Sequence, residues 1–248
     1  MIISTTKKFI FIHINKNGGT SVRHALKNFH TNKFFFNIGN KVDKIIRIKI
    51  LNKNILIGRF LLDIFNLILP ISKKMFRYHE TISTLKNFKK LDEYYKFCII
   101  REPIDRLKSI YFFSLNKPRA ALRSFAIDGI NSFVKNIIKY KLVNTQWDLI
   151  SINEKSVMDD YISFDNMNYD FARICTILNI DSNIFKLQHK NIGKKDSVYL
   201  TQDSIKLIKT YFQKDFELYN LSKNNNYSKK LHHLKIQPQD ILLKLKNK

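Results

Sequence analysis

Glycine and proline are scarce in this chain, and their shortage excludes two classes of protein. The 248 residues include 6 glycines and 4 prolines, too few for a collagen-like or a Pro/Gly-rich disordered protein. With 44% hydrophobic and 13% aromatic residues, the composition is that of a globular protein. We therefore expect a single domain over residues 1–220, followed by a basic C-terminal tail over residues 221–248.

Cysteine is also scarce, which excludes a disulfide framework. The two cysteines are Cys98, in an expected strand, and Cys175, in an expected helix, and both are predicted to be small core residues. No group of cysteines and histidines has zinc-ligand spacing, although His232 and His233 are neighbours in the Lys-rich tail. No metal is expected.

Acidic residues are the third shortage. The 20 Asp and Glu residues stand against 44 Lys and Arg, which gives a formal net charge of +24. Such a charge is typical of proteins that bind a polyanion, whether a sulfated glycan, a nucleic acid or a membrane surface. No RNA- or DNA-binding motif accompanies it, so a nucleic-acid partner is not expected. The alternative is a compositional bias, because Lys, Asn and Ile are all in excess.

The N-terminus lacks the long apolar core of a signal peptide. The apolar stretch over residues 55–71 has about the length of a membrane span, but Arg59 and Asp63 interrupt it at a spacing that suits pairing on one helix face. We predict an amphipathic or buried helix that ends near Pro70, with contact to a membrane surface as the alternative. A cytoplasmic protein without a membrane anchor is expected.

Short apolar runs alternate with stretches of helical spacing, and this order predicts an α/β fold in three layers, with helices on both faces of a parallel sheet. Strands are expected over residues 8–14, 95–100 and 160–164. Helices are expected over residues 20–29, 55–70, 81–90, 103–115, 133–141, 169–178 and 201–219, the last with Thr201 as its N-cap.

The most informative motif is an apolar strand that runs into a glycine turn. Lys16 lies in the turn, Gly18 and Gly19 let the backbone approach a ligand closely, and a helix begins directly afterwards. The free N–H groups and positive dipole end of that helix, together with the lysine, favour a phosphate or sulfate. An ordinary strand–turn–helix is the alternative. The turn consists of Asn15, Lys16, Asn17, Gly18, Gly19, Thr20 and Ser21.

A second motif begins at another apolar run, residues 96–100. Arg101 follows that run directly and is expected at the carboxyl end of a strand, the edge where ligands of open α/β sheets bind. Pro103 suits the first turn of a helix, and Ser109 comes about two turns later. The guanidinium and the hydroxyl are both suited to a phosphate. Taken alone, Arg101 is equally well explained as a solvated charge at a strand end. Ser109, taken alone, is equally well explained as an ordinary residue on a helix surface.

Together the two motifs resemble those of the sulfotransferases. In that superfamily, Pro-Lys-Thr-Gly-Gly-Thr-Ser after a strand binds the 5′-phosphosulfate of 3′-phosphoadenosine-5′-phosphosulfate (PAPS), and Arg-Asp-Pro-x-x-Arg-Leu-x-Ser-x-Tyr binds its 3′-phosphate. Residues 15–21 and 101–111 are similar to these elements, with the closest likeness to the carbohydrate branch that includes the uronosyl 2-O-sulfotransferases. Further fragments match in the right order over about residues 7–220: Tyr78-His79, Phe133-Val134, Gln146-Trp147, Phe164-Asp165-Asn166-Met167, His189-Lys190-Asn191, Tyr199-Leu200-Thr201 and Asp215-Phe216.

The resemblance implies a P-loop-like nucleotide-binding fold and a PAPS-dependent enzyme that sulfates a hydroxyl of a glycan, with an acidic acceptor fitting the charge. In-line sulfuryl transfer needs a binding loop for the leaving phosphate, a cation that stabilises this phosphate, and a base for the acceptor hydroxyl. Lys16 supplies the cation, and His79 matches the histidine base of the branch, with Glu80 as the alternative. The donor-binding residues implied are Lys16, Asn17, Gly18, Gly19, Thr20, Ser21, Arg101, Ser109 and, on a late basic loop that is otherwise a solvated turn, Lys194.

The chain departs from the family pattern at four positions, none of which removes a charged ligand. Asn15 replaces the usual proline, Glu102 the usual aspartate, and Asp165 the usual glutamate. Asn17 replaces the usual threonine, so that a hydroxyl contact to the 5′ group becomes an amide.

Two other classes stay open on the sequence. A P-loop kinase or NTPase shares the strand, turn and helix, but Gly-x-x-x-x-Gly-Lys-Ser/Thr is absent and Lys16 precedes the glycines. A non-enzymatic basic protein would bind any polyanion through charge alone, and salt would abolish that binding.

Overall fold

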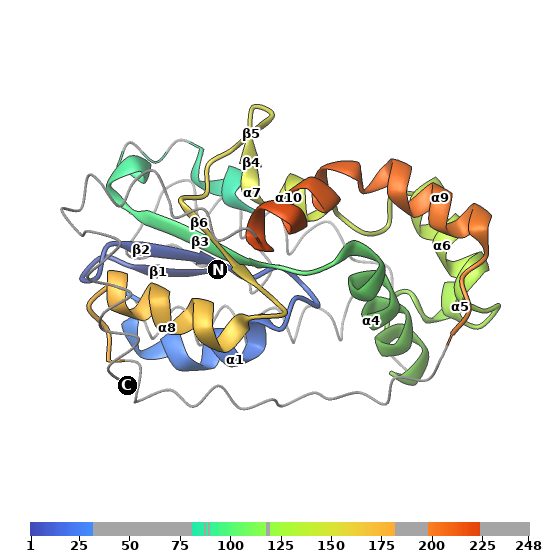
Figure 1. The fold of residues 1–248 in the computed structure, drawn as a ribbon, viewed down its shortest axis with the longest axis horizontal. Helices are drawn as coiled ribbons and strands as arrows, with labels where there is room; N and C mark the ends of the chain where they lie inside the picture. The colour runs from blue at the N-terminus through green and yellow to red at the C-terminus, as the bar shows by residue number, and fades with distance from the viewer. Residues whose placement is uncertain (32–80, 87, 89, 118–119, 182–197, 224–248) are drawn as a thin grey trace, which may run out of the picture.

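A computed structural model describes residues 1–31, 81–86, 88, 90–117, 120–181 and 198–223 (Figure 1). Several predictions fall on other residues and lie outside the described ones. These are the helix over residues 55–70, the base His79 and its alternative Glu80, the donor ligand Lys194, and the basic tail from residue 224 onward.

The centre of the fold is a four-stranded sheet in the order β1-β2-β3-β6. The strands β2 (Phe9–Ile12), β3 (Tyr95–Ile100) and β6 (Asp160–Ser163) are parallel, and β1 (Ile2–Ser4) pairs antiparallel with β2. Every residue of β2 and β3 is buried, as in strands that are covered on both faces. The predicted α/β class with a mostly parallel sheet is confirmed.

Helices cover both faces of the sheet (Figure 1). On one face, Phe9, Phe11 and Phe97 pack against α1 (Gly19–Leu26) and α8 (Met167–Ile177). On the opposite face the alternate strand residues meet a second apolar cluster. The elements of that cluster include the 3₁₀ helix η3 (Ile82–Leu85), α7 (Gln146–Ile150) and α10 (Gln213–Lys223). Successive side chains of a strand point to opposite faces of the sheet. Apolar side chains on both faces therefore need helices on both sides, which gives three layers.

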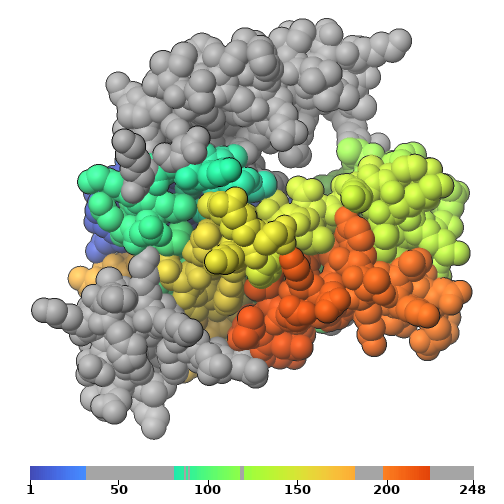
Figure 2. All heavy atoms as spheres, turned by 90° about the horizontal axis from the view of Figure 1, so that it is seen from above, coloured from blue at the N-terminus to red at the C-terminus, as the bar shows by residue number. Residues whose placement is uncertain are grey.

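A third apolar cluster lies beside the sheet and is built mainly from helices. Its elements are α4 (Pro103–Asn116), α5 (Arg123–Ala126), α6 (Ile130–Lys139) and α9 (Gln202–Tyr211). In the space-filling view the orange surface of α9 adjoins the yellow-green surface of α6 (Figure 2). The remaining short elements are η1 (Lys27–Phe29), η4 (Leu91–Glu93), β4 (Ser151–Ile152) and β5 (Lys155–Ser156).

Most predicted elements are present with small shifts at their ends, but the helix expected over residues 81–90 is replaced by the 3₁₀ helix η3, which has four residues. The strand over residues 95–100 coincides with β3, and Thr201 caps α9 by accepting from the backbone N–H of Ser204 at 3.3 Å. Cys98 and Cys175 are both buried and form no disulfide, as predicted. No helix in the part of the chain that the structure describes is long and apolar enough to cross a membrane.

One predicted helix is not continuous in the structure. The helix expected over residues 201–219 is divided at Phe212 into α9 and α10. Ile208 and Phe212 pack in the third cluster, whereas Leu218 packs in the cluster on the sheet. A change of direction lets one amphipathic segment serve two cores, and it also carries Asp215 into the interior.

Candidate active site at the carboxyl edge of the sheet

The candidate site lies where the three parallel strands end. Because their carboxyl ends meet at one edge, the loop after β2, Arg101 after β3 and Phe164 after β6 come together there. Phe164 joins the other two: the guanidinium carbon of Arg101 lies 4.3 Å from the centroid of its ring. A side chain at Gly18 would also meet this ring, because an added Cβ would lie 2.8 Å from Cε2 of Phe164.

Both glycines of the loop are required by the local geometry. Gly18 has φ +77°, a left-handed conformation that disfavours other residues. Gly19 begins α1 against the buried ring of His13, where an added Cβ would lie 2.3 Å from Cδ2 of His13. That ring is stacked on Phe11 with 6.2 Å between the centroids. The glycines therefore set the close approach of the loop to the sheet.

The start of α1 is suited to an anion. Its N-cap, Gly18, supplies no side-chain hydrogen bond, and its first turn has no acidic residue. The first N–H groups of a helix need partners from outside the helix, and the dipole favours negative charge there. Thr20 is exposed and Ser21 is partly exposed in this turn.

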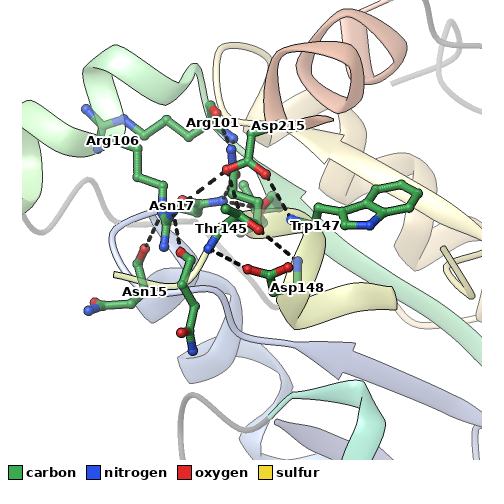
Figure 3. A network of polar contacts seen from close by, with 11 residues as sticks. Asn15, Asn17, Arg101, Arg106, Thr145, Trp147, Asp148 and Asp215 are labelled. Carbon is green, nitrogen blue, oxygen red and sulfur yellow. Dashed lines mark hydrogen bonds and ion pairs between the residues drawn. The ribbon is translucent and has the colours of Figure 1, made fainter. Parts of the chain in front are cut away.

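Arg101 is fixed against the loop by its backbone and its side chain (Figure 3). Its Nη1 donates to the carbonyl oxygen of Lys16 at 3.0 Å. Its backbone N–H donates to Oε1 of Gln146 at 3.0 Å, and its carbonyl oxygen accepts from Nε2 of Gln146 at 2.8 Å. Its Nε is buried and has no partner among the described residues. Burial lowers the pKa of this guanidinium, so a further anionic partner would stabilise it.

Lys16 presents its ammonium beside Arg101. Its Nζ lies 4.5 Å from the centroid of the Phe113 ring, a cation–π contact. Burial, then the positive charges of Arg101 and Lys117, lower the pKa of Lys16. Both charges that act on this partly buried ammonium are therefore positive, whereas Arg101 also experiences the carboxylates of Asp105, Glu102 and Asp165.

The face of α4 that carries Ser109 points toward the loop. Nε of Arg106 donates to the carbonyl oxygen of Asn15 at 3.2 Å, and Phe113 lies under Lys16. Ser109 is three residues after Arg106 and four before Phe113, so it shares their helix face. It is partly exposed. Lys16 and Arg101 are therefore in direct contact, and Ser109 lies on the helix face that also carries Arg106 and Phe113. That these three residues bind the donor stays a prediction.

Behind this site lies a buried polar network that sequence reasoning did not assign (Figure 3). Arg106 is 2% exposed, donates from Nη1 to the carbonyl oxygen of Asn144 at 3.0 Å, and lies 3.9 Å from Oδ2 of Asp215. Burial lowers its pKa to about 10 against the opposing charge of Asp215. Asp215 in turn accepts from the backbone N–H groups of Gln146 at 2.8 Å and Trp147 at 2.9 Å. Arg106 and Asp215 together hold the loop, α4, α7 and α10 in one arrangement.

The sequence did contain a signal for α7. Thr145 and Asp148 form a capping box, in which Thr145 Oγ1 accepts from the Asp148 N–H at 3.0 Å and Asp148 Oδ2 accepts from the Thr145 N–H at 3.3 Å. A threonine three residues before an acidic residue is the usual mark of a helix start.

Asn17 is turned into the protein. It is fully buried, and its Nδ2 donates to the carbonyl oxygen of Ile99 at 2.6 Å and to Oε1 of Gln146. Its Oδ1 is buried without a partner among the described residues. The direct contact to the 5′ group that the resemblance implies for Asn17 stays a prediction.

His79 and Lys194 lie outside the described residues, so the structure does not place them relative to Lys16 and Arg101. Within the described ranges, no cluster of three or more His, Cys, Asp or Glu side chains is arranged to hold a metal ion.

A comparison with known families identifies the chain. The sulfotransferase family matches residues 1–222. The chain belongs to this family. The resemblance predicted from the two motifs is confirmed at that level, and so is sulfuryl transfer as the general reaction. Comparisons with curated proteins and with solved structures gave no match.

Proposed function

We propose that this sulfotransferase moves the sulfuryl group of PAPS to a hydroxyl of a carbohydrate acceptor. The observation that supports the donor most directly is the contact between the two motifs, in which Nη1 of Arg101 donates to the carbonyl oxygen of Lys16 at 3.0 Å. A donor with a charged group at each end needs two anion sites a fixed distance apart. In this proposal the loop with Lys16 and the strand end with Arg101 are these two sites.

Residues at the loop bind the 5′ end of the donor. When bound, PAPS supplies the sulfuryl group and a phosphate leaving group. The N–H groups at the start of α1 receive the 5′-phosphate oxygens, and the ammonium of Lys16 stabilises the negative charge that develops on the bridging oxygen as the S–O bond breaks. Thr20 and Ser21 add hydroxyl donors at the same helix start.

Residues of the second motif bind the 3′-phosphate. Arg101 has an unpartnered, buried Nε and a planar guanidinium held on Phe164, and Ser109 offers a hydroxyl from the neighbouring helix face. In this proposal Lys194 binds the nucleotide as a further cation.

His79 is proposed as the base. Its imidazole takes the proton from the acceptor hydroxyl while the hydroxyl oxygen attacks sulfur, and Glu80 is the alternative. The proposal of an acidic glycan as acceptor rests on the net charge of +24 and on the likeness of the motifs to the carbohydrate branch.

The test has two arms. Calorimetry should show that 3′,5′-adenosine bisphosphate binds more tightly than ATP with magnesium, whereas the reverse order would favour a P-loop kinase or NTPase. Labelled PAPS with a panel of acidic and neutral glycans should then give a labelled glycan. Equal binding of all polyanions, lost on addition of salt, would instead favour a basic protein without this activity.

A further inference from the structure

The carboxamide of Gln146 connects the two halves of the donor site from inside the protein. Gln146 is fully buried at the start of α7. Its Oε1 accepts from the Arg101 N–H at 3.0 Å and from Nδ2 of Asn17, while its Nε2 donates to the Arg101 carbonyl oxygen at 2.8 Å. One side chain thus contacts both the loop that carries Lys16 and the strand end that carries Arg101.

Asn17 completes the connection from the side of the loop. Its Nδ2 donates to the carbonyl oxygen of Ile99 at 2.6 Å as well as to Gln146. The loop is therefore tied to the last residues of β3 by two carboxamides that are both fully buried. Buried hydrogen bonds between neutral groups are directional and water does not replace them readily, so they specify one arrangement.

Gln146 is itself held in place by its own backbone. Asp215 accepts from the N–H groups of Gln146 and Trp147, and the capping box of Thr145 and Asp148 fixes the same helix start. The position of the Gln146 side chain is thus set by α7 and α10, not by the loop that it supports.

We infer that Asn17 and Gln146 are positioning residues that fix the spacing between the 5′ loop and Arg101, so that one nucleotide contacts both. This inference rests on the proposed function for the identity of the nucleotide. It gives Asn17 an indirect role through Gln146, in place of a direct contact to the 5′ group. A ligand with both phosphates depends on the spacing of the two sites, whereas a ligand with one phosphate does not.

The test compares three nucleotides on the full chain: 3′,5′-adenosine bisphosphate, adenosine 5′-monophosphate and adenosine 3′-monophosphate. Gln146→Met keeps the length of the side chain and removes its polar atoms. We expect this substitution to lower the affinity for the bisphosphate about tenfold or more and the affinity for each monophosphate about threefold or less. Only the bisphosphate depends on a preorganised spacing between the two sites. Asn17→Ala should give the same pattern, and it carries the test if Gln146→Met does not fold.

Tyr95→Phe is the matched control. It removes a buried hydrogen bond of 2.6 Å to Asp160 at the opposite end of the same strand, β3. We expect it to lower stability and to leave all three affinities unchanged. A loss confined to the nucleotides with a 5′-phosphate would mean that Asn17 or Gln146 contacts the 5′ group directly, and equal losses for all three would mean a general structural role. Either result overturns the inference.

A second measurement separates this inference from the proposed function. Without nucleotide, the amides of residues 15–19 should exchange hydrogen faster in Gln146→Met than in the wild type or in Tyr95→Phe. If wild-type protein does not bind the bisphosphate, the proposed function fails, and unchanged exchange in Gln146→Met shows separately that the carboxamides do not hold the loop.

Discussion

The ammonium of Lys16 lies 4.5 Å from the centre of the Phe113 ring. Lysine side chains are flexible, and a lysine in a glycine turn has few neighbours to hold it. The ring of Phe113 gives it one preferred position, and the two charges that act on the ammonium, those of Arg101 and Lys117, are both positive. This arrangement places an ammonium where negative charge would develop during sulfuryl transfer.

We expect Lys16→Ala to lower turnover by ~10²–10³, the usual effect of removing one donor that stabilises a transition state. The fold should survive, because the side chain is only partly buried and makes no ion pair among the described residues. Steady-state kinetics with a circular dichroism spectrum measure both effects. Near-normal turnover would exclude Lys16 from this role.

The charge of Lys117 should be visible in the alkaline pH dependence of nucleotide binding. Burial, Arg101 and Lys117 lower the pKa of Lys16, so Lys16 loses its proton at a lower pH than an ordinary lysine. Affinity for 3′,5′-adenosine bisphosphate should therefore fall as the pH rises through that value. Lys117→Gln removes one of the charges that lower the pKa of Lys16. The pKa of Lys16 should therefore rise, and the loss of nucleotide affinity should move to higher pH. Lys206→Gln, on the exposed surface of α9, should not change the pH at which nucleotide affinity is lost.

Arg101→Ala and Ser109→Ala should affect mainly binding of the 3′ end of the donor, although Arg101→Ala also removes the hydrogen bond to the Lys16 carbonyl oxygen. Each should weaken 3′,5′-adenosine bisphosphate much more than adenosine 5′-phosphosulfate, which lacks the 3′-phosphate. Calorimetry with both ligands gives the comparison. Equal losses for the two would refute the assignment of Arg101 and Ser109 to the 3′-phosphate.

His79→Ala should nearly abolish sulfation and leave nucleotide affinity intact, because the base contacts the acceptor. The wild-type rate should fall on the acid side with one ionisation, since a protonated imidazole cannot accept a proton. Loss of sulfation and nucleotide binding together would mean that His79 holds the structure of the site. Unchanged sulfation would transfer the role to Glu80.

Arg106→Met should lower the free energy of unfolding by ~3–5 kcal/mol, because it leaves Asp215 as an unpaired buried charge and frees the carbonyl oxygens of Asn15 and Asn144. Urea unfolding measures this loss. Lys214→Met breaks an exposed ion pair with Glu154 and serves as the control, with little or no expected change. A similar loss in both variants would contradict the structural role of Arg106.

Local patterns predicted the elements that carry the candidate site. The apolar run before Arg101 coincides with β3 because that strand is covered on both faces and needs no polar alternation. The helix after Pro103 begins where the proline indicates, and Glu102 caps it by accepting from the Asp105 N–H at 2.6 Å. The short strand β1 was missed because three residues form no recognisable pattern until β2 is beside them.

The sequence by itself determined the positions of the glycine turn with Lys16 and of Arg101 at the end of a strand, since strand, turn and helix start are local features. Only the tertiary structure decided how these parts are joined. Gln146 lies 45 residues from Arg101, and Asp215 lies 69 residues from Gln146, yet they meet behind the loop. No local spacing predicts such contacts, because they arise from the break between α9 and α10 and from the packing of α7 on the sheet. The motif by itself implied that the carboxamide of Asn17 contacts a ligand. In the folded chain this carboxamide is directed into the interior.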